Sequence, residues 1–258
     1  MLVFKLLLTP VLIGTVSLAG RRWGPTVSGW LVGLPLTSAP VALFLALDQG
    51  TAFASRAAQG TLMGLISVAS FCLAYSWLAF RYGWVGCFLA SSCVFFASTF
   101  ILVRVSVPLV LAFALVIAFL AIVLKLLPGG HDQPMVTVPP QWETFLRMAV
   151  ATAFVLVLTG VSSLLGPLLS GLLTPFPIYA SILGTFTHHF QGAAAACRLL
   201  RGVVTGSFTF AVFFLVVASS LERWGILVAF SLAVLLSLLI HGCSLWFLRQ
   251  GSMVKKSP

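Results

Sequence analysis

The sequence predicts an all-α polytopic membrane protein with about nine transmembrane helices, arranged as two inverted four-helix repeats joined by a fifth helix. Three observations predict this fold. The 258-residue chain is 60% hydrophobic and only 7% charged. Its apolar runs of about 20 residues follow one another with short breaks, and a soluble core cannot cover so much apolar surface. Finally, one stretch of the chain occurs twice.

The duplicated stretch covers residues 24–64 and 166–206. The two copies align without a gap at an offset of 142 and agree at 14 of 41 positions. The shared residues form the pattern G-P-x2-S-G-x5-P, followed by Q-G-x-A-x-A-x-R-x3-G-x3-G. Agreement at glycine, proline, glutamine and arginine does not follow from an apolar composition, so we interpret it as an internal repeat.

The first copy is expected to contain four spans. Residues 1–19 resemble either a signal peptide or a first span, and the duplication favours a span, because 145–161 holds the same place before the second copy. Glycines and prolines interrupt the second span, and Asp48-Gln49-Gly50 precedes the third. The four spans cover residues 1–19, 27–47, 51–80 and 83–103.

A fifth span without a repeat partner and a polar linker connect the two copies. The fifth span covers 105–127, and the linker at 128–140 is rich in glycine and proline. The second copy then gives spans at 145–165, 168–189, 193–221 and 225–248. We divide the chain into a first repeat at 1–104, a connecting region at 105–144 and a second repeat at 145–258.

The number of spans predicts how the copies are oriented. A four-span unit followed by one connecting span places the second copy upside down relative to the first. The loop charges agree, since ten lysines and arginines fall on one face and four on the other. The face with more positive charge is expected to be cytoplasmic. We therefore expect a multi-pass protein of the bacterial inner membrane, with its N-terminus outside and its C-terminus in the cytoplasm.

Spans two and seven are the first candidates for a substrate site. Each is interrupted between a serine and a proline, Ser28 to Pro35 in one and Ser170 to Pro177 in the other. Interrupted helices from the two halves of inverted-repeat carriers tend to form the solute site near the middle of the bilayer. The alternative is that these residues only kink the helices and allow close packing.

The repeated Q-G-x-A-x-A-x-R element is the second candidate. A glycine turn that leads into a helix offers free amide donors, and an arginine in the first turns adds a guanidinium group suited to carboxylate or phosphate. We expect this element to attract an anion on each side of the membrane. The alternative is that the arginines anchor to lipid phosphates. Its residues are Gln49, Gly50 and Arg56 in the first copy and Gln191, Gly192 and Arg198 in the second.

Titratable groups beside these elements suggest proton coupling. Asp48 lies on the predicted outer side, and His188 and His189 lie on the inner side. Helix capping by Asp48 and interfacial solvation of the histidines are the alternatives. No paired carboxylates, cysteine and histidine metal cluster or nucleophile motif is recognisable, so we expect neither an enzyme nor a metal or cofactor.

The second copy resembles a known family. Residues 170–177, Ser-Gly-Leu-Leu-Thr-Pro-Phe-Pro, and the four-span layout around them are similar to the small bacterial GlpM-like membrane proteins. The resemblance covers 145–248 and reaches the first copy only through the duplication. It implies the architecture and no settled activity. The layout is also similar to that of small multidrug-resistance and drug/metabolite carriers, but the chain lacks the membrane-embedded glutamate of their first span.

Together these patterns predict an inner-membrane secondary transporter for a small, anionic or amphiphilic solute, with its site between spans two and seven. Two alternatives stay open. One is a non-transporting scaffold or assembly subunit of an envelope polysaccharide or lipid system, and the other is a lipid-carrier flippase. The expected partners are membrane lipid, a small-molecule solute and, as an option, a second copy of the chain in a homodimer. Nucleic acid is not expected, because the basic residues separate apolar runs.

Overall fold

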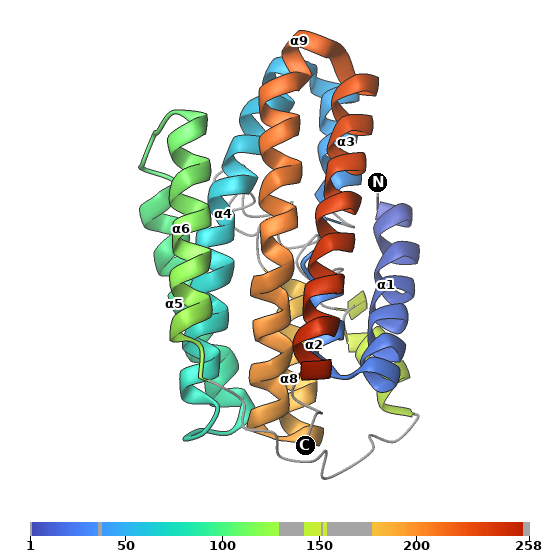
Figure 1. The fold of residues 1–258 in the computed structure, drawn as a ribbon, viewed down its shortest axis with the longest axis vertical. Coiled ribbons are helices and arrows are strands. Elements are labelled where there is room, and N and C mark those ends of the chain that lie inside the picture. The colour runs from blue at the N-terminus through green and yellow to red at the C-terminus, as the bar shows by residue number, and fades with distance from the viewer. Residues whose placement is uncertain (1, 36–37, 129–141, 151, 154–176, 255–258) are drawn as a thin grey trace.

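The described part of the chain is helical throughout and contains no strand (Figure 1). The structure is a computed structural model. It describes residues 2–35, 38–128, 142–150, 152–153 and 177–254, with side chains from residue 10 to residue 242. This confirms the all-helical class. Ser170 and the first half of the predicted seventh span lie outside the described residues.

The first half of the chain forms six helices: α1 (Leu2–Trp23), α2 (Pro25–Val32), α3 (Ser38–Gln49), α4 (Thr51–Leu78), α5 (Trp84–Leu102) and α6 (Leu109–Leu126). The sequence determines where several of them end. Gly24 and Gly50 have φ of 92° and 85°, which favours glycine and separates α1 from α2 and α3 from α4. The predicted second span is two helices, α2 and α3, because the chain leaves the helix at Gly33, the C-cap of α2.

The described second half contains a helical segment at 142–150, α8 (Ile178–Gln191) and the long α9 (Ala193–Val254). Gly225, at φ 73°, bends α9 into two arms, 193–224 and 226–254. The arms correspond to the predicted eighth and ninth spans. Pro177 stands at the N-cap of α8.

The turn between α3 and α4 has the same backbone geometry as the turn between α8 and α9. Gly50 has φ 85° and ψ 167°, and Gly192 has φ 84° and ψ 173°. Both helices before the turn end at a glutamine, Gln49 or Gln191. The repeated Gln-Gly pair therefore forms the same local structure in both places.

The first arm of α9 lies antiparallel against α4. The Ser55 hydroxyl donates to the Ala218 carbonyl at 2.8 Å, and the Cys197 thiol donates to the Ser76 carbonyl at 3.5 Å. The donors Ser55 and Cys197 are separated by the repeat offset of 142, and so are the two acceptors. Each hydrogen bond therefore joins the donor position of one copy to the acceptor position of the other copy, and the two bonds are equivalent under the repeat.

The helix α6, which has no repeat partner, contacts both α4 and α9. Gln59 of α4 donates to the Val107 carbonyl at 2.7 Å, just before α6 begins. Arg201 of α9 donates to the Leu124 and Leu127 carbonyls, at 3.0 and 3.4 Å, where α6 ends. Gln59 and Arg201 are again 142 positions apart, so they are equivalent residues of the two copies. One binds the chain at the start of α6 and the other binds it at the end.

Glycines bring α2 and α9 into backbone contact. Gly29 of α2 and its C-cap residue Gly33 face Gly202 and Gly206 of α9, and a Cβ on Gly206 would lie 2.8 Å from the Gly33 Cα. Both pairs are spaced four residues apart, which lets two helices approach closely in a membrane. This contact holds the short α2 against the centre of the bundle.

Figure 1 defines the two ends of the bundle. At the lower end α1, α4 and α6 finish and α9 begins, while the upper end contains the start of α4 and the bend of α9 at Gly225. Contacts agree with this view, because the Trp77 indole near the end of α4 donates to the Leu126 carbonyl at the end of α6. We use the terms lower end and upper end in this sense.

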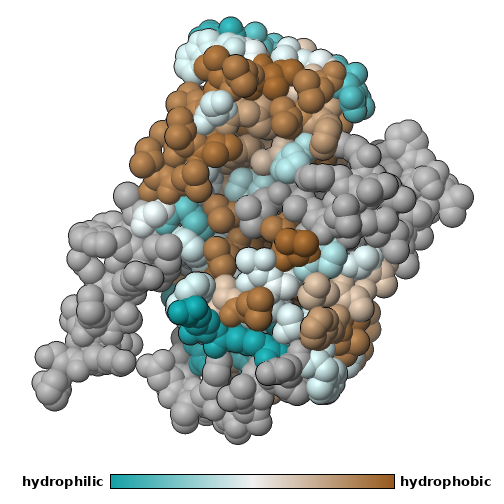
Figure 2. All heavy atoms as spheres, turned by 90° about the vertical axis from the view of Figure 1, so that its right-hand side faces the viewer, coloured by the Kyte–Doolittle hydropathy of each residue, from teal (hydrophilic) through white to brown (hydrophobic). Residues whose placement is uncertain are grey.

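Within the part of the chain that the structure describes, four helices are long and apolar enough to cross a membrane: Thr51–Leu78, Trp84–Leu102, Leu109–Leu126 and Ala193–Gly242. Among the described residues, Ser38–Gln49 is a shorter apolar helix. Figure 2 shows a broad apolar region under a hydrophilic cap, and hydrophilic atoms appear again lower on the same face. The apolar helices indicate a membrane protein. The count of nine spans stays a prediction.

Candidate functional site: a polar hollow at the lower end

The two repeated arginines lie towards opposite ends of the bundle. Arg56 is near the start of α4 at the upper end and is exposed, and its Nε bonds the Ala52 carbonyl of its own helix at 3.3 Å. Arg198 is half-buried near the start of α9 at the lower end. The structure does not bring these two side chains together, which leaves one at each end.

The glutamines before the glycine turns also differ in environment. Gln49 and Gly50 are exposed at the end of α3. Gln191 is half-buried and lines a cavity, whereas Gly192 beside it is exposed. The turn geometry is shared, but only the second copy turns its glutamine into the protein.

The titratable candidates are separated as well. Asp48 is exposed at the end of α3. His188 Nδ1 lies 3.2 Å from the Tyr75 hydroxyl, and the ring of His189 meets Trp84 edge to face at a centroid distance of 5.7 Å. The histidines therefore contact aromatic side chains of α4 and α5 at the lower end.

Ser170 lies outside the described residues, and of the three described candidates from the interrupted spans, Ser28 is the one that lines a polar cavity. Ser28 is 2% exposed and lines the same cavity as Gln191. Pro35 and Pro177 are buried, at the end of the α2 segment and at the start of α8. Two predicted candidates, Ser28 and Gln191, therefore meet at one site.

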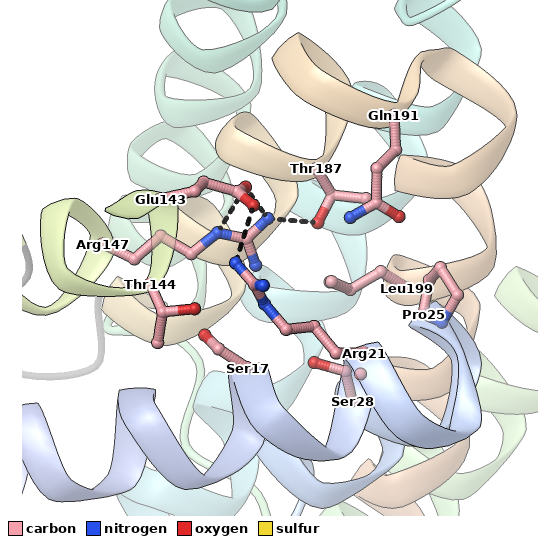
Figure 3. Close-up of a pocket in the computed structure, with 11 residues that line it drawn as sticks. Ser17, Arg21, Pro25, Ser28, Glu143, Thr144, Arg147, Thr187, Gln191 and Leu199 are labelled. Carbon is pink, nitrogen blue, oxygen red and sulfur yellow. Dashed lines mark hydrogen bonds and ion pairs between the residues drawn. The ribbon is translucent and has the colours of Figure 1, made fainter. Parts of the chain in front are cut away.

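That site is a small cavity of about 20 Å³ at the lower end, which we call the polar hollow (Figure 3). Helices α1, α2, α8 and α9 and the helical segment 142–150 all contribute to its wall. Its lining consists of Ser17, Gly20, Arg21, Pro25, Ser28, Glu143, Thr144, Arg147, Thr187, Gln191 and Leu199. Residues distant in sequence therefore form one polar cavity.

A buried ion pair forms one wall of the polar hollow. Arg147 Nε donates to Glu143 Oε1 at 2.9 Å, and the side chains of Arg147 and Glu143 are 6% and 2% exposed. They are four residues apart on one helical segment, so both project from the same face. Arg147 Nη2 also reaches the Thr187 hydroxyl of α8 at 3.4 Å.

A second arginine approaches the same carboxylate from α1. Arg21 Nη2 lies 3.9 Å from Glu143 Oε2, and the Arg21 side chain is 23% exposed. Figure 3 shows the guanidinium groups of Arg21 and Arg147 both directed towards the Glu143 carboxylate from the same side. One carboxylate therefore lies near two cations.

Three further polar atoms of the hollow are buried without a hydrogen-bond partner among the described residues. They are the hydroxyls of Ser17 and Ser28 and Oε1 of Gln191. Buried polar groups nearly always have a partner, and each exception calls for an explanation such as a ligand or water. The unpartnered atoms surround the pair of guanidinium groups, so a polar guest would satisfy them.

The chemistry of this lining suits an anion. Two guanidinium groups and one carboxylate leave one surplus positive charge among the lining residues that the structure describes. Guanidinium groups bind carboxylates and phosphates with paired hydrogen bonds, and serine hydroxyls add neutral donors. No group of three or more metal-ligating side chains occurs among the described residues.

Sequence reasoning missed Arg21, Glu143 and Arg147. Arg21 and Arg147 are among the ten basic residues that the loop-charge pattern places on one face, and no motif includes Glu143 beside the linker. Two signals were available. Glu143 is one of only four acidic residues, and it stands four positions before Arg147 at the start of an apolar span. A charge pair in that place suggests a function inside the membrane.

Comparisons with protein-family models, with curated proteins and with solved structures find no match to this chain.

Proposed function

We propose that this chain is a secondary transporter of the bacterial inner membrane that binds the anionic group of a small solute in the polar hollow. The observation that carries the proposal is the pair of guanidinium groups of Arg21 and Arg147, which face a cavity with unpartnered polar atoms in an otherwise apolar bundle. Charged groups inside a membrane protein are costly, and they commonly mark a solute pathway.

The pairing of the two halves supports a carrier over a scaffold. Ser55 of α4 and Cys197 of α9 hold matching positions in the two copies, and each donates a hydrogen bond to a carbonyl of the other helix. Such a relation is what an inverted repeat produces, and inverted repeats allow a carrier to open alternately to each side. In this proposal the lower end, with its excess of basic residues, faces the cytoplasm, as the N-out, C-in topology requires.

Within this proposal Ser28 and Gln191 orient the polar part of the solute, because both line the polar hollow. Arg198 and Arg56 guide anions towards the two ends of the bundle, since long-range charge raises the local concentration of a charged ligand. His188 stays a proton-coupling candidate through its contact with Tyr75.

The test compares two adjacent arginines in purified full-length protein. Arg21 lines the hollow, whereas Arg22 is exposed and its guanidinium lies 5.5 Å from the centroid of the Trp23 ring. Arg21→Ala and Arg22→Ala each remove one positive charge from the same end of α1. Uptake of labelled small carboxylates and phosphates into proteoliposomes is measured for both variants.

We expect Arg21→Ala to lower uptake at least about tenfold, because it removes a direct contact to the anion, and Arg22→Ala to leave uptake near the wild-type level. If both variants transport alike, the proposed site is wrong. If the wild-type protein transports none of these anions, the transporter proposal is wrong and a scaffold is the better explanation.

A further inference from the structure

A groove of about 400 Å³ lies at the lower end and shares no lining residue with the polar hollow. We call it the Arg81 groove. It is open to the surface, where α4 ends, the chain turns towards α5 and the chain leaves α6, and Figure 1 shows α5 and α6 on the side of the bundle away from α1. Its volume is in the range of pockets that hold small ligands. Its lining consists of Trp77, Leu78, Arg81, Tyr82 and Pro128.

Arg81 brings an uncommitted cation to the groove. Its side chain is exposed, and its guanidinium makes no hydrogen bond or ion pair with any residue that the structure describes. Its backbone N–H bonds the Leu78 carbonyl at 2.9 Å, which holds the residue in the turn after α4. A guanidinium group presents several donors in one plane and suits the oxygens of a phosphate. The groove therefore contains a phosphate-binding group that the protein does not use internally.

The surroundings of the groove are also positively charged. Lys125 is exposed in the last turn of α6, and Arg201 is bonded to the carbonyls where α6 ends. The three acidic residues that the structure describes lie elsewhere. Glu143 lines the polar hollow, and Asp48 and Glu222 lie towards the upper end, beside the start of α4 and the bend of α9. This corner of the bundle therefore attracts an anion.

Aromatic side chains place the groove at the depth of lipid headgroups. Trp77 and Tyr82 of the lining and Trp84 at the start of α5 are all exposed. Exposed tryptophan and tyrosine gather where a membrane meets water, because one side of the ring is apolar and the other is polar. A ligand in the groove therefore lies where the phosphates of a bilayer lie.

An apolar stripe leads from the groove along α6. Leu115, Ile122 and Leu126 are exposed and are spaced seven and four residues apart, so they share one face of the helix. The stripe begins beside the groove, because the Trp77 indole donates to the Leu126 carbonyl at 3.0 Å. An acyl chain can cover this stripe while its headgroup occupies the groove. A free phosphate would leave the stripe uncovered.

We infer that the Arg81 groove binds the phosphate of an anionic phospholipid from the leaflet on the lower side. Arg81 contacts the phosphate, the Tyr82 hydroxyl adds a donor, and Lys125 favours a headgroup without a positive charge of its own. The ligand class is therefore a phosphatidylglycerol-like lipid. This site is separate from the polar hollow and does not depend on transport.

The test measures lipid binding to the purified full-length protein by native mass spectrometry. Dioleoylphosphatidylglycerol and dioleoylphosphatidylcholine are titrated separately. They share their acyl chains and their phosphate and differ in net charge. We expect the wild-type protein to bind its first phosphatidylglycerol at least about fivefold more tightly, because one cation near a membrane surface contributes about that factor towards an anionic lipid.

Two exposed arginines of the lower end form a matched pair. Arg22 lies beside the Trp23 ring, with its guanidinium 5.5 Å from the ring centroid, and lines neither the polar hollow nor the Arg81 groove. Arg81→Gln is expected to reduce the preference for phosphatidylglycerol to within about twofold, and Arg22→Gln to leave it unchanged. Arg81→Lys keeps the charge and should retain most of the preference. Its complete loss in Arg81→Lys would contradict binding through charge.

The remaining outcomes separate the groove from general basicity and a lipid from a free anion. An equal effect of Arg81→Gln and Arg22→Gln overturns the groove as the site. Displacement of phosphatidylglycerol by inorganic phosphate, beyond the effect of sodium chloride at the same ionic strength, overturns the choice of a lipid.

Should Arg81→Gln fail to fold, a phosphatidylglycerol with a photoreactive diazirine in its headgroup tests the wild-type protein directly. It is expected to label residues 77–82 at least about fivefold more than residues 22–23, and equal labelling contradicts the inference.

Discussion

The turns between α3 and α4 and between α8 and α9 share a backbone but differ in chemistry. Gly50 and Gly192 have nearly the same φ and ψ, and both follow a glutamine. The last turn before them differs, since Leu45, Ala46 and Leu47 of α3 correspond to Thr187, His188 and His189 of α8. The two turns therefore keep the same backbone, while the side chains before them are apolar in α3 and polar in α8.

A second contrast follows the same division. At the upper end Arg56 is exposed and bonds its own helix, whereas at the lower end two arginines are directed into a cavity with Glu143. Exposed cations are solvated and contribute little, but buried cations need a partner. The environment of an arginine in this bundle, exposed or buried beside a carboxylate, therefore depends on its position and not on its residue type.

The largest loss of stability is expected when a buried arginine of the lower end is removed. Arg147→Ala leaves Glu143 buried without its main partner, which should cost about 3 to 5 kcal/mol of unfolding free energy and abolish anion binding. Arg223→Ala, an exposed arginine at the upper end, should change stability by less than about 0.5 kcal/mol. The free energy of unfolding of both variants is measured by sodium dodecyl sulfate denaturation in mixed micelles. Equal losses of stability would contradict the difference between the buried arginine of the lower end and the exposed arginine of the upper end.

Two repeat-related glycines offer the next test. A Cβ on Gly202 would lie 2.8 Å from the Trp30 backbone nitrogen and closer still to the Thr26 carbonyl, whereas none of the described residues lies within 4 Å of a Cβ on Gly60. Gly202→Ala should destabilise the protein by about 1 to 3 kcal/mol through overpacking. Gly60→Ala should stabilise α4 by up to about 1 kcal/mol, because alanine is the better helix former.

The same denaturation assay compares the two glycine variants. A loss at Gly60→Ala as large as that at Gly202→Ala would show that the two copies are packed alike at this level. The asymmetry that we describe between α4 and α9 would then be wrong.

The smallest difference is expected at the two ends of α6. Arg201→Leu removes two charged hydrogen bonds to the Leu124 and Leu127 carbonyls and should cost about 1.5 to 3 kcal/mol. Gln59→Leu removes one neutral bond to the Val107 carbonyl and should cost about 1 kcal/mol. Thermal unfolding midpoints rank the two variants. A larger loss for Gln59→Leu would contradict the hydrogen bonding that holds α6.

Much of the fold could be predicted from sequence because apolar length and glycine placement are local signals. The helical class and the turns at Gly50 and Gly192 follow from them. The glycines and prolines of the predicted second span indicate that its helix is interrupted. They do not show where α2 ends and α3 begins, because composition alone does not place the ends of a broken helix. The packing of α2 on α9 needed the structure, because it joins glycines far apart in the chain.

The site was harder to predict than the fold. Ser28 and Gln191 were candidates because they repeat, and the structure places both in the polar hollow. Arg21, Glu143 and Arg147 do not repeat as a set, since Arg21 corresponds to Ser163 and Arg147 to Lys5. A search guided by shared residues therefore misses charged residues that differ between the two copies.

The most direct test of the account asks whether the polar hollow is a positively charged cavity that anions reach from water. Thr144 lines it and is partly exposed, so Thr144→Cys is placed in a background whose five native cysteines are replaced. Its reaction with a negatively charged methanethiosulfonate reagent is compared with that of a positively charged one of similar size, and Ser219→Cys on the exposed upper part of α9 is the control.

We expect Thr144→Cys to react about tenfold faster with the anionic reagent, relative to the control. Equal rates for the two reagents, or a faster reaction with the cationic one, would contradict an anion site at the lower end.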